Sequence, residues 1–200
     1  MKPPGRATGH LTLLLVTGAF LAVTACGVST PSQDRSLTLG GRAMTACTLS
    51  GGVAARCGLL SVPENRATPA GRRIELKVAV LPALDRSKLQ EPVFFLAGGP
   101  GNSALQQWSQ ADSLFPTLRN RHDLVLVDQR GTGDSNPLIF PPIKPEESVD
   151  AYAARALAAI DGDLRFYTTS VAMDDLDAVR SALAYEAIDL YGACLLYTSD

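Results

Sequence analysis

Two glycine-marked loops carry the residues of this 200-residue chain whose types and spacing suit chemistry at a backbone site. Gly98-Gly99-Pro100-Gly101 follows the apolar run 93–96, and the polar stretch 128–135 follows a second apolar run, 124–127. Glycine lets a ligand approach bare backbone amides, and ligands of open α/β sheets bind at the carboxyl ends of strands. We therefore predict a site of backbone N–H donors at the first of these loops.

Other chemistries fit these residues less well. The first loop matches neither the Gly-Lys-Ser/Thr phosphate loop nor the Gly-x-Gly-x-x-Gly dinucleotide pattern. Asp174, Asp175 and Asp177 do not share one helical face and have no histidine nearby, so we expect helix capping and solvation instead of metal binding. The net charge of −2, without charge blocks, gives no sign of a nucleic-acid partner. We predict no metal and no cofactor.

The elements that must position the two loops follow in the order hairpin, strand, helix, strand, helix, strand. We expect strands at 57–63, 73–82, 93–96, 124–127 and 188–191, and helices within 103–120, 146–160 and 171–183. Thr169 or Ser170 is the expected N-cap of the last helix. This order predicts an α/β fold with a mostly parallel sheet, helices on both faces and an antiparallel hairpin at the N-terminal sheet edge.

Taken together, the stretches 98–101, 128–135 and 168–192 resemble the α/β-hydrolase fold, and more closely its proline iminopeptidase and tripeptidyl aminopeptidase branch. The resemblance implies a serine hydrolase that cleaves N-terminal residues or short peptides, or another small acyl substrate, through an acyl-enzyme. It also implies that Gly98 or Gly99 supplies one donor of the oxyanion hole. The alternatives are an ester or lactone hydrolase of the same fold, a non-catalytic binding module, and, for the glycines, a simple tight turn.

The second loop is expected to support the first. Asp128, Arg130, Gly131 and Gly133 are its marked residues, and we expect Arg130 to brace the loop and not to touch substrate. Trp108 suits a pocket wall, the core or the surface.

The nucleophile position departs from the family pattern. The resemblance implies Gly-x-Ser-x-Gly after the last strand, but Gly192-Ala193 is followed by Cys194, and Leu196 replaces the second glycine. Residues 194–200 resemble the translation of a transposon-end adapter used in sequencing libraries, so we hypothesise that they are not native. We accordingly expect the chain as written to be inactive, and the strand at 188–191 to form an exposed, association-prone edge.

The two histidines of the chain agree with the expectation that it is inactive as written. The two histidines are His10, in the N-terminal segment, and His122, just before a strand. In this fold the catalytic histidine follows the serine and the acid, so neither residue suits the role of the base.

The N-terminus predicts export. Lys2 and Arg6 precede the uncharged apolar stretch 11–25, which ends at Cys26 in a pattern that resembles the bacterial lipobox. We expect residues 1–26 to be a lipoprotein-type signal peptide, 27–46 a tether, and 47–193 the hydrolase domain, outside the cytoplasm and held to the membrane by a lipid anchor on Cys26. An ordinary secretory signal is the alternative.

Two further cysteines fit that compartment. Cys47 and Cys57 flank Gly51-Gly52, and disulfides persist outside the cytoplasm. We predict a Cys47–Cys57 disulfide; free or metal-binding thiols are the alternative, for which no neighbouring ligand completes a zinc set.

Overall fold

The computed structural model describes residues 37–192, apart from positions 86, 90, 100 and 113–116. The expected signal peptide, the lipidation site at Cys26 and the tail 194–200 with Cys194 lie outside the described residues. The strands are β1 (Thr38–Leu39), β2 (Arg42–Ala43), β3 (Thr45–Leu49), β4 (Val53–Pro63), β5 (Arg73–Leu81), β6 (Val93–Leu96), β7 (Leu124–Val127) and β8 (Asp189–Gly192). The helices are α1 (Ala104–Asp112), α2 (Leu118–Arg121), α3 (Val149–Ala159) and α4 (Thr169–Ala182), with 3-10 turns η1 (Ser50–Gly52) and η2 (Leu164–Phe166).

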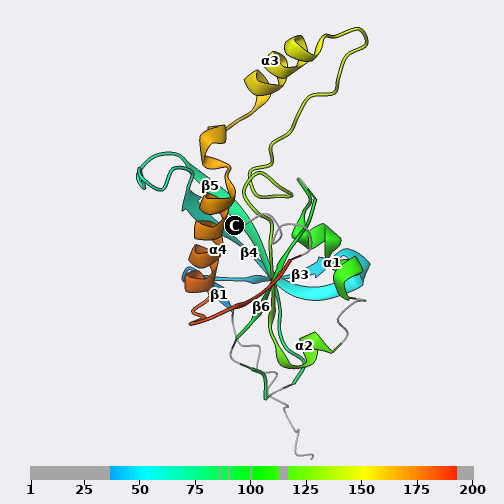
Figure 1. Cartoon of the computed structure of the whole chain (residues 1–200). Helices are drawn as coiled ribbons and strands as arrows, with labels where there is room; N and C mark the ends of the chain where they lie inside the picture. Colours follow the sequence, from blue (N-terminus) through cyan, green and yellow to red (C-terminus); the bar gives the residue numbers. More distant parts are fainter. Residues whose placement is uncertain (1–36, 86, 90, 100, 113–116, 193–200) are drawn as a thin grey trace, which may run out of the picture. The chain divides into compact units, whose positions relative to one another are not determined.

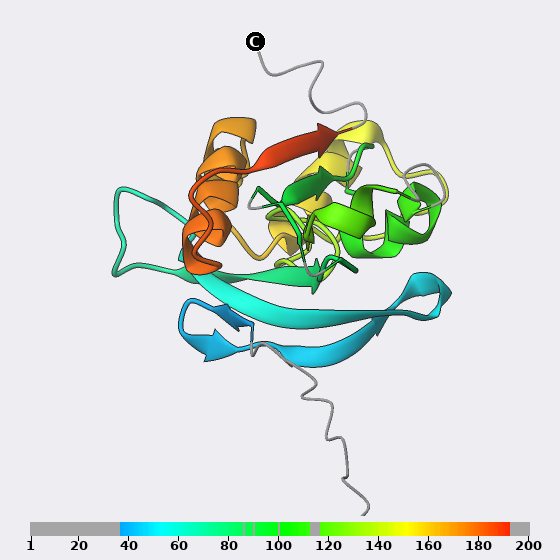
Figure 2. The same cartoon turned by 90° about the horizontal axis from the view of Figure 1, so that it is seen from below.

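Strands β3 to β8 form one mixed sheet in the order β3-β4-β5-β7-β6-β8. β6 is parallel to β7 and to β8, whereas the β3–β4, β4–β5 and β5–β7 pairs are antiparallel. The prediction of a mostly parallel sheet is therefore wrong for the described residues. The predicted hairpin is confirmed as β4–β5, the long curved pair in Figure 2, but it is not at the edge, because β3 and β7 flank it.

The sequence pattern did not predict β3 or the start of β4. Most residues of β3 are exposed or half-buried, so they lack the apolar alternation that marks a half-buried strand. A covalent bond reinforces their pairing: Cys47 of β3 and Cys57 of β4 form a disulfide, with the two Cα atoms 5.8 Å apart. The predicted disulfide is confirmed.

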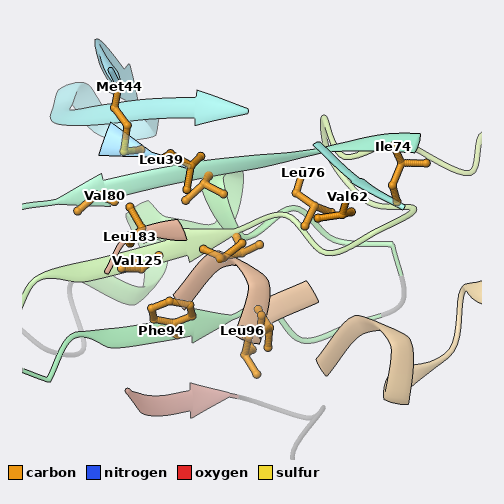
Figure 3. Close-up of a cluster of buried hydrophobic side chains, with 14 residues drawn as sticks. Leu39, Met44, Val62, Ile74, Leu76, Val80, Phe94, Leu96, Val125 and Leu183 are labelled. Carbon is orange, nitrogen blue, oxygen red and sulfur yellow. The ribbon is translucent and has the colours of Figure 1, made fainter. Parts of the chain in front are cut away.

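The helices α1 and α4 cover opposite faces of the sheet (Figure 1). Successive residues of a strand point to opposite faces, so Phe94 and Val125 join the core layer under α4, whereas Phe95 and Leu126 join the layer under α1. Figure 3 shows Phe94 and Val125 together with Leu183, which follows α4. The predicted helical cover on both faces is confirmed, and Trp108, 3% exposed, lies in the layer under α1.

Residues 37–46 are folded, which corrects the expected extent of the tether. β1 pairs with β2, and Leu39 and Met44 are buried in the core layer under α4, as Figure 3 shows. The amide of Gly40 donates to the carbonyl of Ala182 at 2.9 Å. Two apolar side chains among polar neighbours were too sparse a signal to predict this hairpin.

The start of α4 also differs from the prediction. Its N-cap is Thr168, whose hydroxyl accepts from the amide of Val171 at 3.5 Å, and not Thr169 or Ser170. Three consecutive hydroxyl residues can each serve as a cap, so local sequence does not choose among them. In the described part of the chain, no helix is both long and apolar enough to cross a membrane.

Candidate active site

The glycine loop leaves the carboxyl end of β6 and enters α1. Gly99 has a φ of 87°, and a Cβ at this position would run into the Asn102 side-chain amide. Such a backbone angle is strained for any residue with a side chain. The loop therefore requires glycine at position 99 for its conformation as well as for access.

The carbonyls of the two glycines are engaged by the residues that follow them. The carbonyl of Gly98 accepts from the Asn102 side chain at 2.9 Å and from Gln107 Nε2 at 3.3 Å, and the carbonyl of Gly99 accepts from the Asn102 amide at 3.2 Å. The amides of Gly98 and Gly99, by contrast, donate to no other residue in the described ranges. A backbone donor that no described residue engages, at the end of a strand flanked on both sides, suits an oxyanion site; the role of these two amides stays a prediction.

Parallel pairing with β6 brings the carboxyl end of β8 next to the glycine loop. Phe95 is opposite Tyr191, and Leu96 is opposite Gly192. The rings of Phe95 and Tyr191 stack with their centroids 5.7 Å apart, and Phe95 meets Trp108 edge-on at 6.1 Å. The carboxyl end of β8 therefore lies beside the start of the glycine loop, while Cys194 itself lies outside the described residues.

Asp128, which follows β7, is a buried hydrogen-bond acceptor at the start of α1. It is 2% exposed. Oδ1 accepts from Ser103 Oγ at 2.7 Å and from the Leu105 amide at 3.2 Å, and Oδ2 accepts from the Asp134 amide at 3.1 Å. A carboxylate with these donors at a helix N-terminus is favoured by the helix dipole as well.

The second loop folds tightly around this carboxylate. Gly131 and Gly133 both have positive φ, 82° and 49°, and a Cβ on Gly133 would overlap the Asp128 side chain. Ser135 is fully buried, and its hydroxyl accepts from the Lys77 amide of β5 at 2.7 Å. The glycines at 131 and 133 thus let the loop close on Asp128 and on the sheet.

Arg130 points away from the glycine loop and into a buried network. Its Nε donates to Asp175 Oδ2 at 2.6 Å, and one terminal nitrogen donates to Asp175 Oδ1 at 2.8 Å. The other terminal nitrogen donates to the carbonyls of Glu64 and Phe166 at 2.9 and 2.8 Å. Both charged side chains are 2% exposed or less, so Arg130 joins its loop to α4 through a buried ion pair; that it does not touch substrate stays a prediction.

Glu64 and Tyr167 extend this network. Glu64 is 5% exposed, and its carboxylate accepts from the Tyr167 hydroxyl and the Asp163 amide, both at 3.2 Å. Burial, followed by the nearby Glu64 carboxylate, raises the pKa of Tyr167 above its ordinary value. A hollow of about 140 Å³ beside the network is lined by Gln129, Arg130, Tyr167, Thr168, Thr169, Ala172 and Met173.

The structure thus brings some predicted residues together and separates others. Asp128 and Gly133 meet Ser103 at the end of the glycine loop, whereas Arg130 turns toward α4. His122 lies at the entry to β7, where its Nδ1 is 2.8 Å from the Glu91 carbonyl oxygen. Among the described residues, no group of three or more histidine, cysteine or acidic side chains is arranged to hold a metal.

Sequence reasoning missed two residues that matter here. Ser103 carried a usable signal, because Ser103-Ala-Leu-Gln106 has the Ser-x-x-Gln spacing of a helix capping box, and its hydroxyl accepts from the Gln106 amide at 3.1 Å. Asp175 was assigned to capping and solvation. It is instead the buried partner of Arg130, a long-range pairing that local sequence does not show.

The mixed sheet carries its glycine loop at the carboxyl end of β6, next to β7 and β8. No family model matches the chain, but distant relatives are found among the α/β-hydrolases. Tripeptidyl aminopeptidases of Streptomyces lividans and Streptomyces coelicolor are each 26% identical over 163 residues, 68% of this chain. The chain spans about 30% of the length of these curated relatives. The crystal structure of proline iminopeptidase from Mycobacterium smegmatis matches with a TM-score of 0.43 and 20% identity, over 68% of this chain and 35% of that one.

Proposed function

We propose that this chain contributes the oxyanion-binding half of an exported serine hydrolase that releases N-terminal residues or short peptides. The observation that carries the proposal is that the amides of Gly98 and Gly99, beside the carboxyl end of β8, donate to none of the residues that the structure describes. The distant similarity to tripeptidyl aminopeptidases supports a peptide substrate over other acyl compounds.

The proposed chemistry is acyl transfer. A serine hydroxyl at position 194, where this chain has Cys194, attacks the scissile carbonyl while a histidine takes its proton. One amide of the glycine loop and the amide of the residue after the nucleophile donate to the oxyanion that forms, and the histidine then protonates the leaving amine. One such donor contributes about 3 kcal/mol of transition-state stabilisation. Water then hydrolyses the acyl-enzyme.

Two measurements test the proposal. Sequencing the locus from unamplified DNA should reveal serine at position 194 and glycine at 196; a genomic sequence that continues through residues 194–200 as written would contradict this. The locus-encoded protein should hydrolyse tripeptidyl or aminoacyl nitroanilides in preference to nitrophenyl esters. Preference for esters would instead support an ester or lactone hydrolase, and a locus without Gly-x-Ser-x-Gly would support a binding module.

The 200-residue chain is the matched control. We expect no turnover from it, because cysteine stands at the nucleophile position and leucine replaces the second elbow glycine. Turnover that is abolished by Cys194→Ala would show that this cysteine is itself a working nucleophile.

Export and anchoring form a separate part of the proposal. The apolar stretch 11–25 and Cys26 support a lipidated N-terminus outside the cytoplasm. We expect the protein in the membrane fraction of a bacterial host, and a Cys26→Ala variant in the soluble extracytoplasmic fraction or unprocessed. Equal membrane association of the two proteins would contradict a lipid anchor.

A further inference from the structure

We infer that Asp128 is a positioning residue for the glycine loop: its buried carboxylate fixes the start of α1, and α1 in turn fixes the direction of the Gly99 amide. The structural part of this inference stands on contacts alone. Its consequence for catalysis rests on the proposed function.

The first step is the attachment of α1 to Asp128. Oδ1 accepts from the Ser103 hydroxyl at 2.7 Å and from the Leu105 amide at 3.2 Å, which are the residues on either side of the first residue of α1. Oδ2 accepts from the Asp134 amide at 3.1 Å. One carboxylate thus joins the first turn of α1 to the loop after β7.

The second step is the attachment of the glycine loop to Gln107 of α1 and to Asn102, which leads into α1. The Asn102 side chain and Gln107 both donate to the Gly98 carbonyl, at 2.9 and 3.3 Å. The Gly98 carbonyl and the Gly99 amide belong to one planar trans peptide unit, in which C=O and N–H point in opposite directions. Holding the carbonyl toward α1 therefore aims the Gly99 N–H away from α1.

The hydrogen-bond partners of Asp128 decide how its variants should behave. All three partners donate, and a carboxylate accepts on both oxygens, whereas asparagine accepts on one and presents N–H groups on the other side. Asp128→Asn should keep the hydrogen bonds from Ser103 and Leu105 and lose the one from the Asp134 amide. Asp128→Ala should lose all three hydrogen bonds and leave buried donors unpaired.

The chain offers a matched control at the other end of the same strand. Asp123 precedes β7, is 3% exposed, and accepts from the Ala83 amide, from Lys88 and from the Tyr185 hydroxyl. Like Asp128, it is a buried aspartate that accepts from three residues, but none of these contacts involves the glycine loop. Asp123→Ala therefore reproduces the loss of a buried carboxylate without the proposed positioning effect.

The test that does not depend on activity uses amide proton–nitrogen correlation spectra of the 200-residue chain. In Asp128→Ala we expect the resonances of Gly98, Gly99 and Asn102 to shift or broaden, with a smaller change in Asp128→Asn. Ser103→Ala, which deletes one donor and keeps the carboxylate, should also move them. Asp123→Ala should leave these three resonances in place. Unchanged glycine resonances in Asp128→Ala and Ser103→Ala, or equal changes in Asp123→Ala, would overturn the inference.

The second test measures the catalytic consequence in the locus-encoded enzyme. Misaiming one oxyanion donor lowers kcat by about tenfold or more while KM stays nearly constant. Affinity for a transition-state analogue, such as a peptide boronate, should fall in parallel, and affinity for a product peptide should not. An unchanged kcat in Asp128→Ala would refute the catalytic role. If the unmodified enzyme has no activity, the proposed function fails while the spectra still decide the structural inference.

Discussion

Arg130 and Asp175 form a buried two-point ion pair that ties the loop after β7 to the middle of α4. Arg130 follows Asp128 by two residues, and Asp128 holds the start of α1 on the opposite face of the sheet. One short loop therefore fastens a helix on each face at the carboxyl end of β7.

Breaking this pair should destabilise the protein strongly. Arg130→Ala removes the two-point pairing of Asp175, which keeps Arg66 as a partner, and takes a donor from the carbonyls of Glu64 and Phe166. We expect the free energy of unfolding to fall by about 3 kcal/mol. Urea denaturation measures the change. Arg165→Ala is the control, because Arg165 is 81% exposed and pairs with its close neighbour Asp163; its unfolding should be nearly unaffected. Equal effects of the two substitutions would contradict a structural role for the buried pair.

Replacing Ala184 by glycine should stabilise the protein. It has a φ of 60° at the end of α4, where its amide donates to the Ser181 carbonyl and the Tyr185 amide donates to the Arg180 carbonyl. This is a Schellman ending, whose left-handed position favours glycine. Ala184→Gly should raise the free energy of unfolding by about 1 kcal/mol. Ala153→Gly, in the middle of the regular helix α3, should lower it by about the same amount; thermal and urea melts of the two variants should move in opposite directions.

Asp123 should make stability depend on acid pH. Burial opposes ionisation of its carboxyl, but hydrogen bonds from Lys88, Ala83 and Tyr185 outweigh burial and lower its pKa. A lowered folded-state pKa gives a contribution that is fully present above the unfolded value of about 3.9 and is lost as pH falls through the folded value. The difference in unfolding free energy between the parent chain and Asp123→Asn should be constant from pH 7 to about 5 and shrink below about 4. A difference that is independent of pH over this range would contradict the argument.

The Cys47–Cys57 disulfide should contribute to stability in oxidising conditions. It closes a loop of sequence separation 10, for which the chain-entropy model gives roughly 2–3 kcal/mol. Dithiothreitol should lower the urea midpoint of the parent chain. A variant with both cysteines replaced by alanine should have a lower urea midpoint than the parent chain, and dithiothreitol should not change that midpoint. A parent chain that is equally stable with and without dithiothreitol would contradict the prediction.

Several elements could be predicted from local sequence. The apolar runs at β6 and β7 were located to the residue, because strands buried on both faces lack polar positions. The alternation of β5 and the apolar spacing of α4 also predicted their elements, although the cap of α4 was placed too late. β1, β2 and β3 were missed, since their few buried side chains, such as Leu39, occur among exposed ones.

By itself, the sequence determined which residues have special backbone freedom or buried strand character. Glycine at 99, 131 and 133 permits positive φ, the runs at β6 and β7 require a two-sided cover, and both are local consequences of side-chain size and polarity. The tertiary structure decided which polar groups meet: Asp128 with Ser103, and Arg130 with Asp175. The sheet order was also decided there, because antiparallel pairing of β5 with β7 depends on long-range hydrogen bonds and on packing between distant segments, which no local pattern of residues encodes.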